Sequence, residues 1–206
     1  MTEVFLQAPP HIEHAGPPVR RIDDRRGTFG MVLFIATEAT LFVMLFMAYF
    51  YVAKGGDRWK TEEAPKLHYS LPMLGVLLTS SVVLHWGEKQ LKEGKYGLAR
   101  AGLIGTIALG ILFLGLSYLD YAEHLLHLTP QANAYGSIFY TITSLHVAHV
   151  ITGLLMMGWL LLVAPHWEPA QHTPHRPYHN VSMYWHFVDT VWVFIIAILY
   201  VSPHFL

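Results

Sequence analysis

One glutamate and two histidines lie inside long apolar stretches of this sequence. Glu38 is the single charged residue between positions 29 and 53, and His146 and His149 lie in residues 134–164, which carry no charge. If these stretches cross a membrane, an isolated acid there costs a few kcal/mol and needs a proton, a partner or a function. A Glu–His hydrogen bond would satisfy both groups. We predict a buried pair of Glu38 and His146, which handles protons, makes a polar contact with lipid or another subunit, or only locks two helices together.

Other polar side chains lie near the ends of apolar stretches. His186 and Asp189 are three residues apart, so on a helix they share a face and can hydrogen-bond to each other. We expect Asp120 and Tyr121, which follow an uncharged stretch, to contact water or to cap neighbouring elements.

A haem site is a second interpretation of the histidines. Two axial histidines must face each other from different helices at one depth, and the candidates are His85, His146, His149 and His186. The first and last lie near one end of their stretches, whereas the middle two are central. A copper or iron site would need about three converging histidines, which these depths do not supply. We therefore predict no catalytic, cofactor-binding or metal-binding residue on this chain, and keep a stand-alone cytochrome b-like haem protein as the rival class.

Composition and charge placement identify the elements that must hold these residues. The chain is 53% hydrophobic and only 13% charged, against about 25% charged in a typical soluble domain. A spanning helix needs about 20 mostly apolar residues, and five segments meet this. No cysteine is present, which excludes a disulfide framework and thiolate-bound metal. We predict an all-α integral membrane bundle of five transmembrane helices near residues 29–53, 70–90, 97–119, 136–164 and 181–203.

Residues 1–27 are polar, contain four prolines and lack the apolar core of a signal peptide. We predict a polar N-terminal tail over 1–27 and one membrane domain over 28–206. Lys and Arg are enriched on the cytoplasmic side of membrane proteins, and nine of the thirteen fall on the side of the N-terminus, which predicts a cytoplasmic N-terminus and an outside C-terminus. The net charge of −1 argues against a nucleic-acid partner.

Four ordered motifs resemble subunit III of the haem–copper oxidases. Residues 30–38 read GMVLFIATE, and residues 78–94 begin LTSS and end LKEG. Residues 135–153 join a Tyr-Gly-Ser start to a His-x-x-His-Val run, and residues 184–192 read YWHFVDTVW. The resemblance covers about residues 28–203 and is strongest to the bacterial, five-helix form of cytochrome c oxidase subunit III, which lacks the first two helices of the family.

The resemblance implies a subunit without its own haem or copper, in a cytochrome c oxidase that reduces oxygen to water and pumps protons. Subunit I, on which subunit III packs, and subunit II would carry those cofactors. Subunit III would hold phospholipid, support proton uptake and protect the enzyme from turnover inactivation. The glutamate of the family maps onto Glu38 and its first central histidine onto His146; further polar positions map onto His149, His186, Asp189, Asp120 and Tyr121.

The sequence departs from the family pattern at a few positions. Ser144 and Val147 replace usual glycines, the usual basic residues after the fourth helix are absent, and His85 matches no family position. The implied location is the bacterial plasma membrane. The subunit III of a quinol oxidase remains the near alternative, and membership of a respiratory supercomplex stays open.

Overall fold

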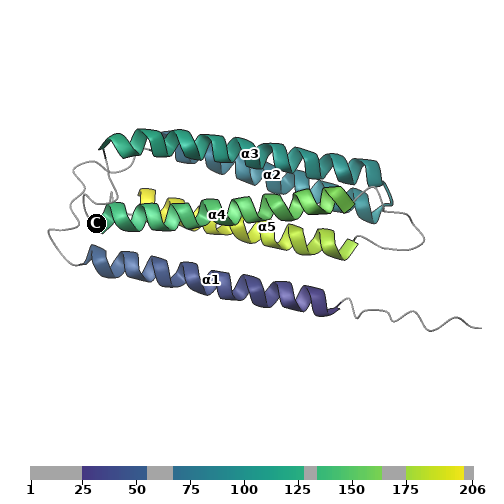
Figure 1. Cartoon of the computed structure of the whole chain (residues 1–206), viewed down its shortest axis with the longest axis horizontal. Helices are drawn as coiled ribbons and strands as arrows, with labels where there is room; N and C mark the ends of the chain where they lie inside the picture. The colour runs from purple at the N-terminus through teal and green to yellow at the C-terminus, as the bar shows by residue number, and fades with distance from the viewer. Residues whose placement is uncertain (1–24, 55–66, 128–133, 164–174, 202–206) are drawn as a thin grey trace, which may run out of the picture.

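The protein is a bundle of long helices. The structure, a computed structural model, describes residues 25–54, 67–127, 134–163 and 175–201. Within these ranges it contains five helices long and apolar enough to cross a membrane, and no strand. They are α1 (Arg25–Ala53), α2 (Leu67–Lys92), α3 (Tyr96–His127), α4 (Ala134–Val163) and α5 (His175–Ile195), which continues as the π-helix η3 (Ile196–Val201). Figure 1 shows the five helices lying nearly side by side. The predicted all-α, five-span membrane fold is confirmed.

Several helices extend beyond their predicted limits. The first starts at Arg25 rather than at residue 29, so the end of the predicted tail is helical, while residues 1–24 lie outside the described part. The third continues to His127 and the fifth starts at His175, six residues early. Charge marks the edge of the apolar layer, but a helix continues past that edge because its backbone hydrogen bonds do not depend on lipid. Pro177 is tolerated because it lies in the first turn.

The second and third helices form a tight hairpin. Gly94 has a φ of 76°, and the amides of Gly94 and Lys95 donate to the carbonyls of Leu91 and Gln90 at 3.0 and 2.9 Å. This pattern is a Schellman motif, which satisfies the last carbonyls of α2. In the same turn, the hydrogen bond from Lys95 to Glu93 (2.7 Å) lowers the pKa of the Glu93 carboxyl.

Close approach of the α2 and α3 backbones depends on two glycines. A Cβ placed on Gly102 would stand 2.8 Å from the Cα of Gly87. Such a distance is shorter than side chains allow, so Gly102 accepts no larger residue without a backbone shift. A Cβ on Gly87 would stand 3.3 Å from the Cα of Gly102 and would displace the hydroxyl of Tyr178, 2.3 Å away. Small residues at helix crossings are typical of membrane bundles, because in lipid the helices associate through van der Waals packing rather than through the hydrophobic effect.

The fifth helix is the centre of the bundle. In the most apolar 18-residue stretch of α5, 56% of the residues are buried, against 6% in the corresponding stretch of α1. The indole of Trp185 lies over two glycines of neighbouring helices: a Cβ on Gly110 would be 3.1 Å from its ring, and one on Gly153 would be 2.8 Å away. Its Nε1 donates to Ser80 Oγ at 2.8 Å. Trp185 therefore joins α2, α3, α4 and α5 at one point.

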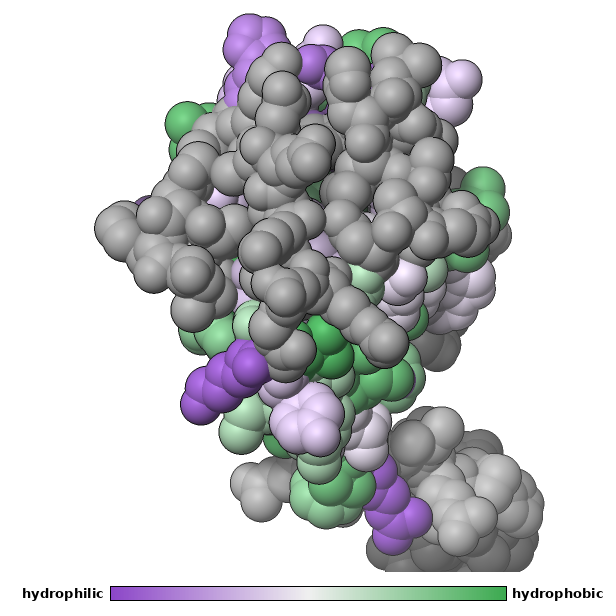
Figure 2. All heavy atoms as spheres, turned by 90° about the vertical axis from the view of Figure 1, so that its left-hand side faces the viewer, coloured by the Kyte–Doolittle hydropathy of each residue, from purple (hydrophilic) through white to green (hydrophobic). Residues whose placement is uncertain are grey.

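The first helix lies at the edge of the bundle and contacts α4 and α5 (Figure 1). Its inward stripe includes Glu38, Phe42 and Tyr49, of which the two aromatic rings are buried, while most of its other side chains are exposed. Figure 2 looks at the bundle end-on, with apolar side chains in green. The exposed side chains of α1 include Phe29, Met44 and Met47, as expected for a surface that faces lipid or another subunit.

Candidate functional site

Glu38 is paired across the α1–α4 contact. Its Oε2 lies 3.1 Å from Nε2 of His149, and the phenyl ring of Phe42 packs against the imidazole at 5.1 Å. The other ring nitrogen, Nδ1, lies 2.8 Å from the carbonyl oxygen of Leu145. A carbonyl only accepts, so Nδ1 carries a proton and donates it. The side chains of Glu38 and His149 remain 23% and 11% exposed, so the pair is close to the surface of this chain.

The fixed Nδ1 proton restricts what the pair can do. Either a protonated Glu38 donates to the bare Nε2, or Nε2 carries a second proton and donates it to the carboxylate. In both arrangements one proton is held between the two side chains, and the pair is neutral as a whole. Such a pair avoids placing net charge in the membrane, which would cost several kcal/mol.

The predicted contact between Glu38 and His146 is wrong. His146 lies at a similar depth, but three residues on a helix leave it about 60° around the axis from His149. That rotation turns it away from α1 and into the bundle, where it is fully buried. Its ring stacks on Trp192 of α5 at 5.0 Å and meets the edge of Phe113 of α3 at 5.8 Å. Depth can be read from sequence; the direction a side chain faces depends on helix packing.

The predicted His186–Asp189 contact is mediated by a serine of another helix. Ser81 of α2 lies 2.9 Å from Nδ1 of His186 and also hydrogen-bonds to Oδ2 of Asp189. Nε2 of His186 lies 3.4 Å from Ser182 Oγ, one turn earlier on α5. Sequence reasoning gave Ser81 no role. The available signal was its place in an uncharged stretch, opposite a helix with an acid and an imidazole.

A second acid–histidine contact, which the sequence analysis missed, lies at the end of the same interface. Glu88 of α2 is 5% exposed and lies 3.0 Å from Nδ1 of His179 on α5 and 2.9 Å from Nζ of Lys92. Together with Ser81, His186 and Asp189, these residues form a line of polar contacts along α2 and α5. We call this line the α2–α5 seam.

Asp120 is buried and contacts a neighbouring element, so of its two expected roles the contact with water is wrong. It is 1% exposed, and its Oδ2 accepts a hydrogen bond from the hydroxyl of Tyr200 at 3.0 Å. Tyr200 lies in η3, the π-helical end of α5, and the neighbouring Leu199 carbonyl accepts a 2.7 Å hydrogen bond from Tyr135. Tyr121 lies 3.4 Å from Ser144 of α4. These contacts tie the last turns of α3 and α5 to the first half of α4.

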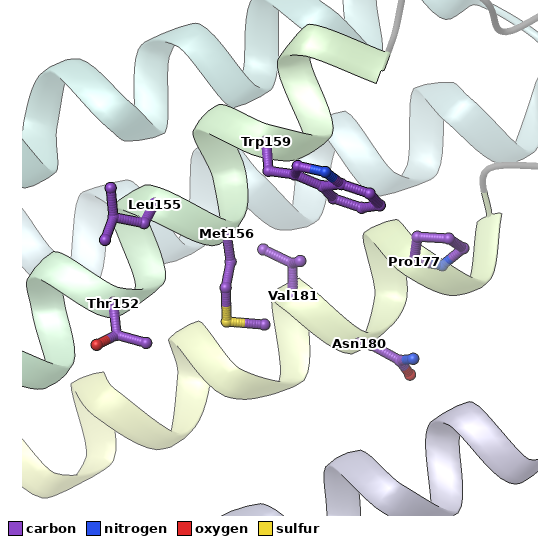
Figure 3. A pocket seen from close by; sticks show the side chains of 7 residues that line it. All are labelled: Thr152, Leu155, Met156, Trp159, Pro177, Asn180 and Val181. Carbon is purple, nitrogen blue, oxygen red and sulfur yellow. The ribbon is translucent and has the colours of Figure 1, made fainter.

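An open cavity of about 480 Å³ lies at the surface between α4 and α5, and its lining residues Leu155 and Trp159 are 69% and 60% exposed. Figure 3 shows Thr152, Met156 and Trp159 on the α4 side and Pro177, Asn180 and Val181 on the α5 side, with α1 nearby. Most of the lining is apolar. A volume in this range suits a ligand of a few hundred daltons or part of a chain molecule.

Among the described residues, no group of three or more His, Asp or Glu side chains is arranged to hold a metal ion. The four histidines considered for haem are dispersed: His149 is bound to Glu38, and His186 to Ser81. His146 faces aromatic rings, and His85 is exposed on α2. The fold and these contacts define a multi-pass helical membrane protein whose polar groups bind one another between helices.

Comparisons with known proteins place this bundle in a family. A family model described as cytochrome c oxidase subunit III matches residues 23–203. Cytochrome c oxidase subunit 3 of the cyanobacterium Synechocystis is 29% identical over 97% of this chain and 83% of the relative. The proteins of the same name from Polypterus ornatipinnis and Branchiostoma lanceolatum are 32% and 34% identical, over 91% and 83% of this chain and 72% and 67% of the relatives. The chain belongs to the cytochrome c oxidase subunit III family and is therefore a component of a multi-subunit oxidase complex.

Proposed function

We propose that this chain is the non-catalytic subunit III of a proton-pumping cytochrome c oxidase in a bacterial plasma membrane. It packs on subunit I in a complex whose subunits I and II carry haem and copper, with its N-terminus in the cytoplasm and its C-terminus outside. The observation that carries the proposal is the Glu38–His149 pair, held at the midpoint of spans that match the family. Subunit III stabilises the catalytic subunit during turnover and supports the proton uptake of that subunit.

The pair has the properties that a proton-related role requires. It holds one proton between two groups, it lies at an edge helix, and it stays partly exposed. A neighbouring subunit or lipid that covers α1 would meet Glu38 directly. Glu38→Gln retains a side chain that can donate to Nε2 but cannot release a proton, so it separates structure from chemistry.

The test uses the intact complex, purified in mild detergent with its partner chains identified. We expect subunit I to co-purify and the Glu38→Gln complex to keep the haem spectrum of the wild type. We also expect it to lose activity faster during sustained turnover or to take up protons more slowly. Thr40→Ala, an exposed position on the same helix whose hydroxyl bonds only to the Ala36 carbonyl, is the control. Equal lifetimes and uptake rates in all three complexes would contradict the role of Glu38.

We further propose that the cavity between α4 and α5 takes a phospholipid acyl chain. Its walls are apolar, and the amide of Asn180 lies at the end where α5 begins. Arg26 lies exposed at the start of α1, next to Gly27, whose added Cβ would stand 3.8 Å from the Asn180 amide nitrogen. A cationic guanidinium near the mouth suits a lipid phosphate. This arrangement would replace the basic residues that the family usually has after the fourth helix.

Native mass spectrometry of the complex tests lipid retention. We expect Trp159→Ala combined with Arg26→Gln to release at least one phospholipid that the wild type retains. Trp86→Ala, an exposed tryptophan of α2 outside this cavity, should retain it. Equal lipid content in all three complexes would exclude the cavity as a lipid site.

The electron donor is proposed to be cytochrome c because each of the reported relatives is named as a subunit of cytochrome c oxidase. The donor is bound by subunit II in this class of enzyme. A dicopper motif in the co-purified subunit II supports cytochrome c, whereas its absence would support the quinol oxidase alternative.

A further inference from the structure

Four buried polar atoms at the centre of the bundle are unused by the function proposed above. They are Nδ1 and Nε2 of His146, Nε1 of Trp192 and Oδ1 of Asp189, and none has a hydrogen-bond partner among the described residues. The three residues are 0%, 2% and 5% exposed. A buried polar group without a partner loses its hydration with nothing to replace it, so this concentration requires a physical explanation.

The three residues lie on adjacent parts of α4 and α5. His146 stacks on Trp192 with ring centroids 5.0 Å apart and planes inclined by 23°. Phe113 of α3 presents its edge to both rings, at 5.8 and 5.2 Å. Asp189 precedes Trp192 by three residues and therefore lies on the same side of α5, one turn away.

Stacking prevents the two rings from satisfying each other. The N–H groups of imidazole and indole point outward in the ring planes, so two nearly parallel rings cannot donate to one another. The stack leaves these nitrogens at the ring edges, where a third group must meet them. Because Phe113 offers only carbon, that group cannot come from its side chain.

The donors and acceptors identify the chemistry of that third group. Trp192 only donates, a neutral imidazole presents one donor and one acceptor, and the free oxygen of Asp189 accepts when the carboxyl is ionised. The missing group must therefore accept from the indole N–H and also donate to the bare imidazole nitrogen, which neither a metal cation nor an unprotonated anion can do. A water molecule can donate two hydrogen bonds and accept two, and buried water molecules typically make about three.

We propose that ordered water is bound between α4 and α5 by His146, Trp192 and Asp189. This water receives the Trp192 N–H and donates to Asp189 Oδ1 or to the bare nitrogen of His146. Asp189 is then bonded through both oxygens, to Ser81 on one side and to water on the other. The water extends the α2–α5 seam to α4 at mid-membrane. The inference concerns residues of this chain alone and does not depend on the electron donor or on the role of Glu38.

A cryo-EM map of the intact oxidase complex in lipid nanodiscs, at a resolution that shows water, tests the proposal. We expect a density peak within about 2.7–3.2 Å of Trp192 Nε1, and within the same distance of a His146 nitrogen or Asp189 Oδ1. A map in which these atoms contact only protein carbon, or bond directly to a protein group, would overturn the proposal.

His146→Phe gives a second readout that needs no water-resolving map. It keeps the stacked ring and removes both nitrogens. If water already satisfies His146, the variant loses those hydrogen bonds and its unfolding temperature falls or stays level. If His146 has no partner, removing two unsatisfied groups raises the unfolding temperature, which would contradict the proposal. Tyr135→Phe is the matched control because its hydroxyl has a known partner, the Leu199 carbonyl at 2.7 Å; its unfolding temperature should fall, which shows that the assay detects the loss of one satisfied buried hydrogen bond.

Discussion

The α1–α4 contact and the α2–α5 seam each combine a carboxylate with a histidine, but they do so differently. Glu38 and His149 come from two helices, touch directly, and keep part of their surface exposed. His186 and Asp189 come from one helix and are joined by Ser81 of another, with Asp189 almost completely buried. The first arrangement is a single contact at an edge helix. The second belongs to the core.

This difference separates two kinds of polar contact in a membrane protein. A contact between an edge helix and the bundle can be broken or covered without disturbing the rest of the fold, so it suits exchange with a neighbour. A contact in the core leaves unsatisfied groups on both sides when it is broken. We therefore expect substitutions in the seam to affect stability and substitutions of the pair to affect function.

The largest expected effect comes from Trp185, which lies beside the seam. Trp185→Ala removes the side chain that lies over Gly110 and Gly153 and leaves Ser80 without its donor. Loss of a buried tryptophan typically costs about 3–5 kcal/mol. Reversible unfolding in mixed micelles, followed by circular dichroism, measures this loss. Trp159→Ala, which truncates a tryptophan 60% exposed on α4, should cost much less; similar losses would show that α5 is not the centre of the bundle.

A smaller effect is expected for Ser81→Ala. The variant removes the hydroxyl that binds both His186 and Asp189, which costs about 1–3 kcal/mol. Thr79→Ala is its control, because the Thr79 hydroxyl bonds only within its own helix, to the Gly75 carbonyl at 2.7 Å. The same unfolding assay compares the two. If both variants lose the same stability, the seam contributes nothing beyond an ordinary helix hydroxyl.

The smallest effect on stability is expected for Glu38→Gln. The amide keeps a hydrogen-bond donor toward Nε2 of His149, so the unfolding free energy should change by less than about 1 kcal/mol. The measurement is the unfolding midpoint, taken on the same preparations as the turnover lifetime. A loss as large as that of Ser81→Ala would place the pair with the core contacts and remove the distinction between the two regions.

Much of this organisation can be predicted from sequence because lipid imposes strong constraints. Charge is excluded over about 20 residues per span, so five helices and the unusual position of Glu38 are visible directly. The end of α3 and the start of α5 lie outside the predicted limits because the uncharged stretches end at the membrane interface, whereas the helices continue past it. The π-helical end of α5, which brings Tyr200 to Asp120, has no sequence signal of this kind.

The partners of the polar residues are harder to predict. Choosing between His146 and His149 requires the rotation of α4 about its axis, and a difference of about 60° decides it. Ser81 was missed because hydroxyl side chains in spanning helices commonly bond to their own backbone, as Thr79 and Thr152 do. Nothing in the sequence distinguishes Ser81 from them until α5 is placed opposite.

A double-mutant cycle for Glu38 tests the account most directly. The unfolding free energies of Glu38→Ala, His149→Ala and the double variant give the coupling between the two side chains. A second cycle combines Glu38→Ala with His146→Ala in the same way. Residues in contact couple by about 0.5–3 kcal/mol, and residues without contact by no more than about 0.3–0.5 kcal/mol. We predict coupling in the Glu38–His149 cycle and none in the Glu38–His146 cycle; the reverse result would contradict the structure of the α1–α4 contact.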